Sequence, residues 1–298
     1  MSITSYLVRK TFARNDKKRD AGLTTPVFVQ RFDDIQYGPD RKWQVLDVYR
    51  PIHKEGPLPV IINVHGGGMV YGDKELYQYY CMGLVEHGFA VVNYTYRLAP
   101  EFKFPSALED TALVFGWVLE NREKYGFDVN HVFAVGDSAG ANLLGLYCCI
   151  YGNPDYAKNF SFSAPRCPKA VVLNCGVYHQ TYSRKKNLNS LLMANLMPGK
   201  GKPEEYRLLC VDEFASENFP PAFIMTGEGD FLAAQAQPFY ETLKRLGVDA
   251  EYHYYGDTDH VLGHVFQCNI RLPEAIQCTR EECEFLRRFI KSDEGPDH

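Results

Sequence analysis

Residues 131–147 constrain the fold of this chain more than any other stretch. An apolar, β-branched run, Val132–Val135, leads into Gly136-Asp137-Ser138-Ala139-Gly140 and then into an apolar segment without proline. This pattern is typical of a strand, a tight turn and a helix, and the glycines are needed because a Cβ at either position would collide with neighbouring backbone. We therefore predict a sharp turn that holds Ser138 at positive φ and presents its hydroxyl at a helix N-terminus, where the helix dipole favours negative charge.

Strand-like and helix-like segments alternate along the rest of the chain. Gly126 and Gly247 follow two of the helical segments and mark their ends. This alternation predicts the α/β class, with a doubly wound, mostly parallel sheet and helices on both of its faces. The strand patterns lie at 43–49, 60–64, 89–94, 132–135, 170–174, 222–226 and 250–255, and the helical patterns at 75–87, 105–125 and 234–246.

Length and composition indicate a single domain over residues 1–298, because 298 residues that are 45% apolar suffice for one large core. Two segments outside the alternation predict a small helical cap. Residues 176–221 have no buried-strand run and contain the apolar cluster Leu191–Met197, and an insertion of this length is more often a lid than a linker. Residues 1–35 mix basic and aromatic side chains, which suits either a covering amphipathic helix or a solvated basic arm.

Charge and cysteine content exclude several classes of protein. The net charge of −5 is interspersed, which provides neither a basic stripe for nucleic acid nor a polybasic anchor for a membrane. No apolar run has the length of a signal peptide core or a membrane span. The nine cysteines form no metal-ligand pattern, so we expect no metal and a reduced, cytoplasmic compartment. The oligomeric state stays open, a homodimer included.

A second motif, His65-Gly66-Gly67-Gly68, directly follows the strand predicted at 60–64. Chance would produce such a run in about one chain in 500 of this length. Consecutive glycines let backbone N–H groups converge without side chains in the way, so those of Gly67, Gly68 and Ala139 can bind the oxyanion of a tetrahedral intermediate. A phosphate-binding turn is the competing interpretation, but no Lys-Ser/Thr follows the glycines.

Together with further motifs, these residues resemble the hormone-sensitive-lipase-like esterase family of the α/β-hydrolase superfamily. The resemblance spans most of residues 42–290. It implies a mainly parallel sheet capped by an N-terminal segment and an insertion, and a serine carboxylesterase that needs no cofactor. The matching segments, in family order, are His65–Gly68, Tyr96-Arg-Leu-Ala-Pro-Glu101, Phe104-Pro105, Ala107-Leu-Glu-Asp110 and Gly136–Gly140.

The family implies the chain order Ser, Asp, His for its catalytic residues, and the chemistry requires the same three groups. The Ser138 hydroxyl is a weak nucleophile unless a neutral imidazole takes its proton and a carboxylate orients that imidazole. After the strand at 222–226, Gly227-Glu228-Gly229-Asp230 resembles the acid loop of the family. We predict Asp230 as the acid, with Glu228 as the alternative.

Two histidines compete for the role of the base in the loop that follows the strand at 250–255. His260 lies at the gapless family-like interval from Asp230, whereas His264 begins the His-x-Phe pattern usual at the base and precedes a helix-like segment. We favour His264, which implies an insertion in this loop, and keep His260 as the alternative.

The expected activity is therefore hydrolysis of small esters with short acyl chains by a Ser138, Asp230 and His264 triad. Acetylated carbohydrates and amides are alternative substrates, because the same machinery serves them and only the pocket differs. A non-catalytic ligand receptor, as in the plant gibberellin receptors, is the alternative of a different class. It is disfavoured because a Ser, an Asp and a His are all present here.

Overall fold

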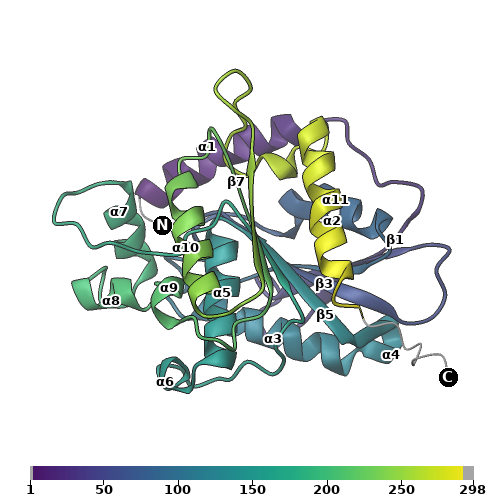
Figure 1. Cartoon of the computed structure of the whole chain (residues 1–298), viewed down its shortest axis with the longest axis horizontal. Coiled ribbons are helices and arrows are strands. Elements are labelled where there is room, and N and C mark those ends of the chain that lie inside the picture. Colours follow the sequence, from purple (N-terminus) through teal and green to yellow (C-terminus); the bar gives the residue numbers. More distant parts are fainter. Residues whose placement is uncertain (1–2, 291–298) are drawn as a thin grey trace.

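The computed structural model describes residues 3–290 and contains one mixed sheet of eight strands (Figure 1). The strand order across the sheet is β1-β2-β4-β3-β5-β6-β7-β8. The strands are β1 (Val29–Gln36), β2 (Val45–Pro51), β3 (Leu58–Val64), β4 (Ala90–Thr95), β5 (Phe127–Asp137), β6 (Val171–Asn174), β7 (Ala222–Gly227) and β8 (Ala250–Tyr255).

The six strands from β3 to β8 run parallel to one another, whereas β2 pairs antiparallel with both of its neighbours, β1 and β4, near one edge. Parallel strands need crossover connections, and the helices in those connections cover both faces of the sheet. This arrangement confirms the predicted α/β class with a doubly wound, mostly parallel sheet.

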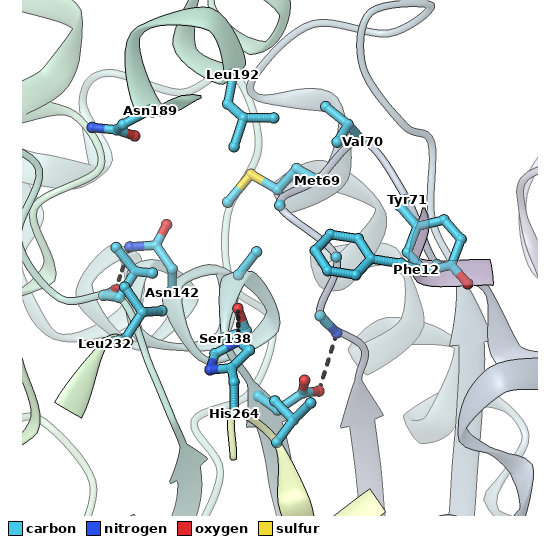
Figure 2. A pocket seen from close by; sticks show the side chains of 18 of the residues that line it. Phe12, Met69, Val70, Tyr71, Ser138, Asn142, Asn189, Leu192, Leu232 and His264 are labelled. Atoms are coloured by element: carbon cyan, nitrogen blue, oxygen red, sulfur yellow. Dashed lines mark hydrogen bonds between the residues drawn. The ribbon is translucent and has the colours of Figure 1, made fainter. Parts of the chain in front are cut away.

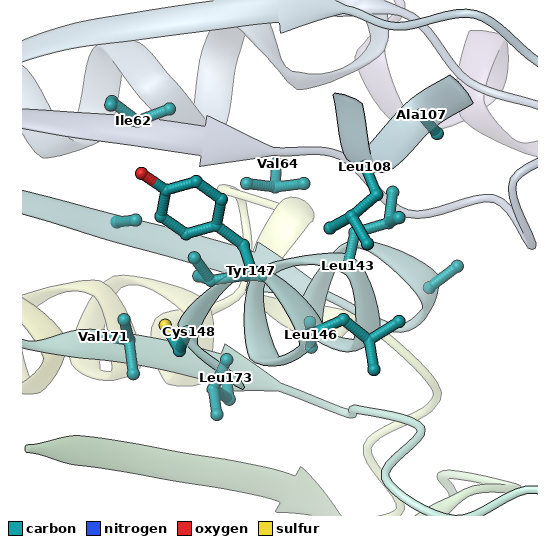
Figure 3. Packing of buried hydrophobic residues seen from close by; sticks show 14 of the residues in the cluster. Ile62, Val64, Ala107, Leu108, Leu143, Leu146, Tyr147, Cys148, Val171 and Leu173 are labelled. Atoms are coloured by element: carbon teal, nitrogen blue, oxygen red, sulfur yellow. The ribbon is translucent and has the colours of Figure 1, made fainter. Parts of the chain in front are cut away.

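Each face of the sheet buries its own apolar layer, because alternate side chains of a strand point to opposite faces. Within β3, Val60, Ile62 and Val64 belong to the layer that also includes helices α3, α5 and α10, whereas Ile61 belongs to the layer with α2 and α11. Figure 3 shows Tyr147 and Leu143 of α5 packing against this first layer. The central strands are thus buried on both sides.

The helices connect and cover the strands. In chain order they are α1 (Ile3–Asp20), η1 (Lys74–Tyr77), α2 (Gln78–Glu86), α3 (Ser106–Glu120), α4 (Arg122–Tyr125), α5 (Ala139–Gly152), α6 (Pro154–Ala157), α7 (Leu188–Leu196), α8 (Pro203–Arg207), α9 (Val211–Phe214), α10 (Ala233–Arg245), η2 (Phe266–Cys268) and α11 (Pro273–Arg287).

The two segments that we grouped as a cap have different structures. Residues 29–36, at the end of the N-terminal segment, form the edge strand β1 and therefore belong to the sheet. The helix α1 is in contact with α7, and both lie at the same end of the molecule (Figure 1). The insertion 176–221 carries α7, α8 and α9 and no strand.

Candidate active site

Ser138 sits at the junction of β5 and α5 in a strained backbone conformation, with φ 52° and ψ −117°. The flanking glycines permit this turn: a Cβ on Gly136 would lie 2.8 Å from the Gly140 backbone, and one on Gly140 would lie 2.0 Å from the Val64 carbonyl oxygen. The Ser138 N–H donates to the carbonyl of Asn174 at 2.8 Å, which ties the turn to the end of β6. The predicted sharp turn is therefore present.

His264 lies between Ser138 and Asp230. Its Nε2 is 3.0 Å from the Ser138 hydroxyl oxygen, and its Nδ1 is 2.6 Å from an Asp230 carboxylate oxygen. Figure 2 shows Ser138 and His264 joined at the base of a cavity. The three side chains come from the C-terminal ends of β5, β7 and β8, which are brought together by the parallel sheet.

The Asp230 carboxylate is buried and held by three hydrogen bonds. Besides the bond with His264, it accepts from the Thr226 hydroxyl at 2.7 Å and from the Leu232 N–H at 2.9 Å. Burial acts to raise the pKa of Asp230, but these hydrogen bonds outweigh burial and hold the pKa below its ordinary value. Asp230 is therefore ionised at neutral pH, as an acceptor for the imidazole N–H must be.

The alternative residues, His260 and Glu228, lie away from Ser138. The His260 side chain is 57% exposed and pairs with Glu274 at 2.8 Å, whereas the His264 side chain is only 18% exposed. Glu228 accepts a hydrogen bond from the Tyr254 hydroxyl. Of the two histidines in the loop between β8 and η2, it is therefore His264 that contacts Ser138.

Cys175 is a neighbour of the triad that the sequence did not reveal. Its Sγ accepts a hydrogen bond from the Val265 N–H at 3.4 Å, and Val265 has a φ of 54° that is rare for a β-branched residue. Burial raises the pKa of the Cys175 thiol, so this side chain is a neutral packing partner of the turn that carries His264. No motif marks such a residue.

The glycine loop after β3 lines the same cavity as Ser138. Gly67 and Gly68 have φ values of 108° and 65°, and a Cβ on Gly67 would lie 2.1 Å from the Tyr71 carbonyl oxygen. Within residues 3–290, the N–H groups of Gly67, Gly68 and Ala139 have no protein acceptor. Three free donors therefore belong to residues that line the same cavity as Ser138.

Asp137 fixes the start of this glycine loop. The Gly66 N–H donates to the Asp137 carboxylate at 3.1 Å and is 3.0 Å from the Tyr77 hydroxyl, which itself donates to Asp137 at 2.9 Å. Burial raises the pKa of Asp137 to about 6, while these hydrogen bonds act in the opposite direction. Because Asp137 precedes Ser138 in the chain, the network couples the glycine loop directly to the turn.

His65 supports the same loop as a neutral, fully buried ring. Burial lowers the pKa of His65 to about 4, and its Nδ1 lies 2.7 Å from the Gly66 carbonyl oxygen. The ring stacks on Tyr96 with centroids 3.9 Å apart, and the Tyr96 hydroxyl donates to the His65 carbonyl. His65 is therefore a structural histidine, because its ring is used by the loop and does not contact Ser138.

A cavity of about 590 Å³ opens above Ser138 and is mainly apolar. Within the apolar cluster Leu191–Met197 of the predicted lid, Leu192, Met193 and Leu196 line the cavity, but Leu191 is exposed and Met197 packs in the core. Figure 2 shows Leu192 and Met69 facing each other across from Ser138. Other lining residues come from α1 (Phe12, Asp16, Arg19), the glycine loop (Gly66–Gly72) and the segment before α7 (Val177, His179–Thr181).

Long side chains attach α1 over this cavity. Arg9 donates to the carbonyls of Val70 and Ala99, and Arg19 donates to the Leu76 carbonyl. The Tyr71 hydroxyl donates to Asp16 at 2.8 Å. Of the two interpretations of the N-terminal segment, α1 therefore fits a covering helix rather than a solvated arm.

Two groups of side chains have the donor atoms of metal ligands. Cys175, Asp230 and His264 form one group, and their donor atoms lie within 4.8 Å of one another. The other group is His179, Cys210 and Glu213. Asp230 and His264 already bond to each other, and Glu213 already pairs with Arg207 at 2.7 Å.

None of the described helices has the length and apolar character needed to cross a lipid bilayer.

The chain is similar to proteins of one family. A family model described as the alpha/beta hydrolase fold matches residues 61–264. The versiconal hemiacetal acetate esterase of Dothistroma septosporum is 27% identical over 228 residues, which are 72% of this chain and 69% of that protein. Esterase LipQ of Mycobacterium tuberculosis is 29% identical over 231 residues. That match covers 74% of this chain but only 54% of LipQ, about half of its length.

Solved structures of esterases have the same fold. Esterase B from Lactobacillus rhamnosis, in a structure inhibited by a C4-C4 SN3 tributyrin phosphonate, superimposes with a TM-score of 0.86 at 24% identity. That match covers 96% of this chain and 95% of esterase B. A Pyrobaculum calidifontis esterase matches with a TM-score of 0.77 at 26% identity, over 98% of this chain and 95% of that one.

Proposed function

The chain belongs to the hormone-sensitive-lipase-like esterase family of the α/β-hydrolase superfamily, and on this premise we propose that it hydrolyses small carboxylic esters with Ser138 as the nucleophile. The single observation that carries the proposal is the continuous row of hydrogen bonds from Ser138 through His264 to Asp230 at the base of an apolar cavity. A serine in such a row can attack a carbonyl carbon at neutral pH.

In the first half of the reaction, His264 accepts the Ser138 proton through Nε2 as the hydroxyl oxygen attacks the ester carbonyl. The ionised Asp230 accepts the Nδ1–H, which fixes the ring tautomer and stabilises the imidazolium that forms. His264 then gives the proton to the departing alcohol, and an acyl-serine remains. Water attacks this acyl-serine in the second half, with His264 again as the base, and releases the carboxylic acid.

We assign the oxyanion to the N–H groups of Gly67, Gly68 and Ala139. Both tetrahedral intermediates carry negative charge on the former carbonyl oxygen, and one such donor typically contributes about 3 kcal/mol to the stability of the transition state. The free state of these three donors and the dipole of α5 support this assignment. The bonds from Gly66 to Asp137 and Tyr77 would keep the loop in place during the reaction.

Short acyl chains are the substrates that we propose. The walls formed by Leu192, Met193 and Leu196 suit an apolar chain, and the cavity volume of about 590 Å³ limits its length. The names of similar proteins support the same size class, since one is a hemiacetal acetate esterase and another, an ethyl acetate hydrolase, is 34% identical over 99 residues. No cofactor takes part in the proposed reaction.

The test is kcat/KM for a series of 4-nitrophenyl esters from acetate to dodecanoate, together with an acetylated sugar and matched anilides. We expect the highest kcat/KM for the shortest acyl chains, acetate to hexanoate, and turnover of the anilides far below that of the esters. Comparable rates on anilides and esters would indicate an amidase. A preference for the acetylated sugar would indicate a carbohydrate esterase, and binding of esters without turnover would indicate a receptor.

A further inference from the structure

A second hollow lies at the opposite end of the sheet from Ser138. It is an open groove of about 670 Å³ at the N-terminal ends of β3 and β5, beside α4, and it shares no lining residue with the cavity above Ser138. Residues of α4 line the groove, and Figure 1 shows α4 far from α1 and α7. The charged residues among its described lining are Arg50, Arg122, Glu123 and Lys124.

Arg50 lines this groove from β2 and is the unusual feature of the site. Arg50 is only 9% exposed, and its guanidinium donates to the carbonyls of Tyr125, Gly126 and Gly56. Among residues 3–290 no carboxylate lies within ion-pair distance of Arg50, and its Nε–H has no acceptor. Carbonyl groups satisfy part of its hydrogen-bonding capacity, but they leave its full positive charge without a counterion.

The lack of a counterion distinguishes Arg50 from Arg19 and Arg97, two other arginines of low exposure. Arg19 and Arg97 each bond to carboxylates, and those contacts raise the pKa of both groups despite the opposing effect of burial. Burial alone acts on Arg50 and lowers its pKa. A buried cation is stabilised mainly by a paired anion, so the groove beside the Arg50 guanidinium is electrostatically suited to an anion.

Two further cationic residues line the same groove, and they flank one acidic residue in the sequence. Arg122 and Lys124 belong to α4, and Glu123 is the one acidic residue among the described lining residues. Glu123 is 90% exposed at its side chain and is 3.6 Å from Arg122, which is a weak surface pair. The positive charge of the groove therefore exceeds the negative charge by two.

We propose that this groove binds a phosphoryl group, either as inorganic phosphate or as part of a small organic phosphate. The planar guanidinium of Arg50 supplies fixed N–H donors of the kind that bind oxyanions in pairs, and Arg122 and Lys124 supply charge at the mouth. The proposal does not depend on ester hydrolysis, because the groove contains none of the residues assigned to that reaction.

The experiment measures binding of inorganic phosphate and of AMP to the full chain by isothermal titration calorimetry at constant ionic strength. The test variants are Arg50→Gln and the double variant Arg122→Gln/Lys124→Gln. The matched control is Arg184→Gln/Lys158→Gln, which removes two exposed cations elsewhere. Circular dichroism shows whether each variant is folded. If Arg50→Gln fails to fold, phosphate binding by the double variant, which changes only surface residues, tests the proposal.

We expect saturable binding of one phosphoryl group with a Kd of about 1 mM or tighter. The double variant should bind about tenfold or more weakly, and the control should equal the wild type. Tighter binding of AMP than of phosphate identifies an organic phosphate as the ligand, and equal binding identifies phosphate itself. Absence of saturable binding in the wild type, or equal binding by the double variant and the wild type, would overturn the proposal.

Discussion

The C-terminal edge of the sheet and the segments that cover it are held in place in different ways. At the edge, Ser138, Asp230 and His264 are fixed by short bonds to one another and to adjacent strand ends. The cover is attached by long side chains such as Arg9, and Leu191 of α7 is 40% exposed. The difference indicates that the chemistry depends on a rigid frame, whereas substrate preference depends on surfaces that can change without disturbing that frame.

The largest effect is expected for Ser138→Ala. Removal of the hydroxyl oxygen leaves only binding and oxyanion stabilisation, so kcat for 4-nitrophenyl butyrate should fall by a factor on the order of 10⁴ or more. Thermal unfolding should be unchanged within about 1 kcal/mol, because no core contact is lost. Residual activity above a few per cent of the wild type would show that the rigid edge is not the reaction centre.

The two histidines of one loop provide the next comparison. His264→Ala should reduce kcat about as much as Ser138→Ala, because no other imidazole among residues 3–290 bonds to Ser138. His260→Ala is the matched control and should keep most of the activity, since it removes only a surface pair with Glu274. An inactive His260→Ala together with an active His264→Ala would reverse the assignment of the base.

The buried carboxyl of Glu282 supports the frame below the site and should make stability depend on pH. Glu282 accepts hydrogen bonds from Tyr80 and from Asn174, the residue whose carbonyl binds the Ser138 N–H. Burial raises the pKa of Glu282 to about 7 from an ordinary value of 4.5. Between these values the folded protein keeps a proton that the unfolded chain has lost, so Glu282 makes the protein less stable as pH rises through this window.

Glu282→Gln removes this titration. Its free energy of unfolding relative to the wild type should therefore increase by up to about 3 kcal/mol between about pH 5 and about pH 8. Urea unfolding at several pH values measures this difference. A difference that stays constant with pH, or that decreases as pH rises, would show that Glu282 is ionised in the folded protein across the whole range.

The smallest effect is expected in the cover, where adjacent leucines of α7 serve as variant and control. Leu192 lines the cavity and Leu191 does not. Leu192→Ala should lower the ratio of hexanoate to acetate turnover, in kcat/KM, by about fourfold, because one lost buried CH₂ contact is worth about 0.8 kcal/mol. Leu191→Ala should leave the ratio unchanged. Equal ratios in both variants would show that α7 does not contact the acyl chain.

Most of the sheet could be predicted from sequence because parallel strands are buried on both faces and form continuous apolar runs, such as Val60–Val64. The edge strand β1 could not, because its residues, Val-Gln-Arg-Phe-Asp-Asp-Ile-Gln, have only one buried position and a pairing irregularity near Asp34. The helix expected at 105–125 is interrupted at Asn121, where α3 ends and α4 begins.

The candidate site was predictable where a short motif fixes a backbone shape, as at Gly136–Gly140 and Gly66–Gly68. Interactions between distant segments were not predictable, because no local pattern records them. Cys175 and Val265 are 90 residues apart in sequence yet hydrogen-bonded. Arg50 resembles any surface arginine in sequence, and only the tertiary structure shows that it is buried without a carboxylate.

The central claim is that Ser138 is the nucleophile activated by His264, and covalent labelling tests it most directly. A fluorophosphonate reacts only with an activated serine, and mass spectrometry of the digested protein locates the adduct. We predict one adduct per chain, on Ser138, with labelling at least about 10²-fold slower in His264→Ala and nearly unchanged in His260→Ala. An adduct on any other residue, or active enzyme that acquires no adduct, would contradict the account.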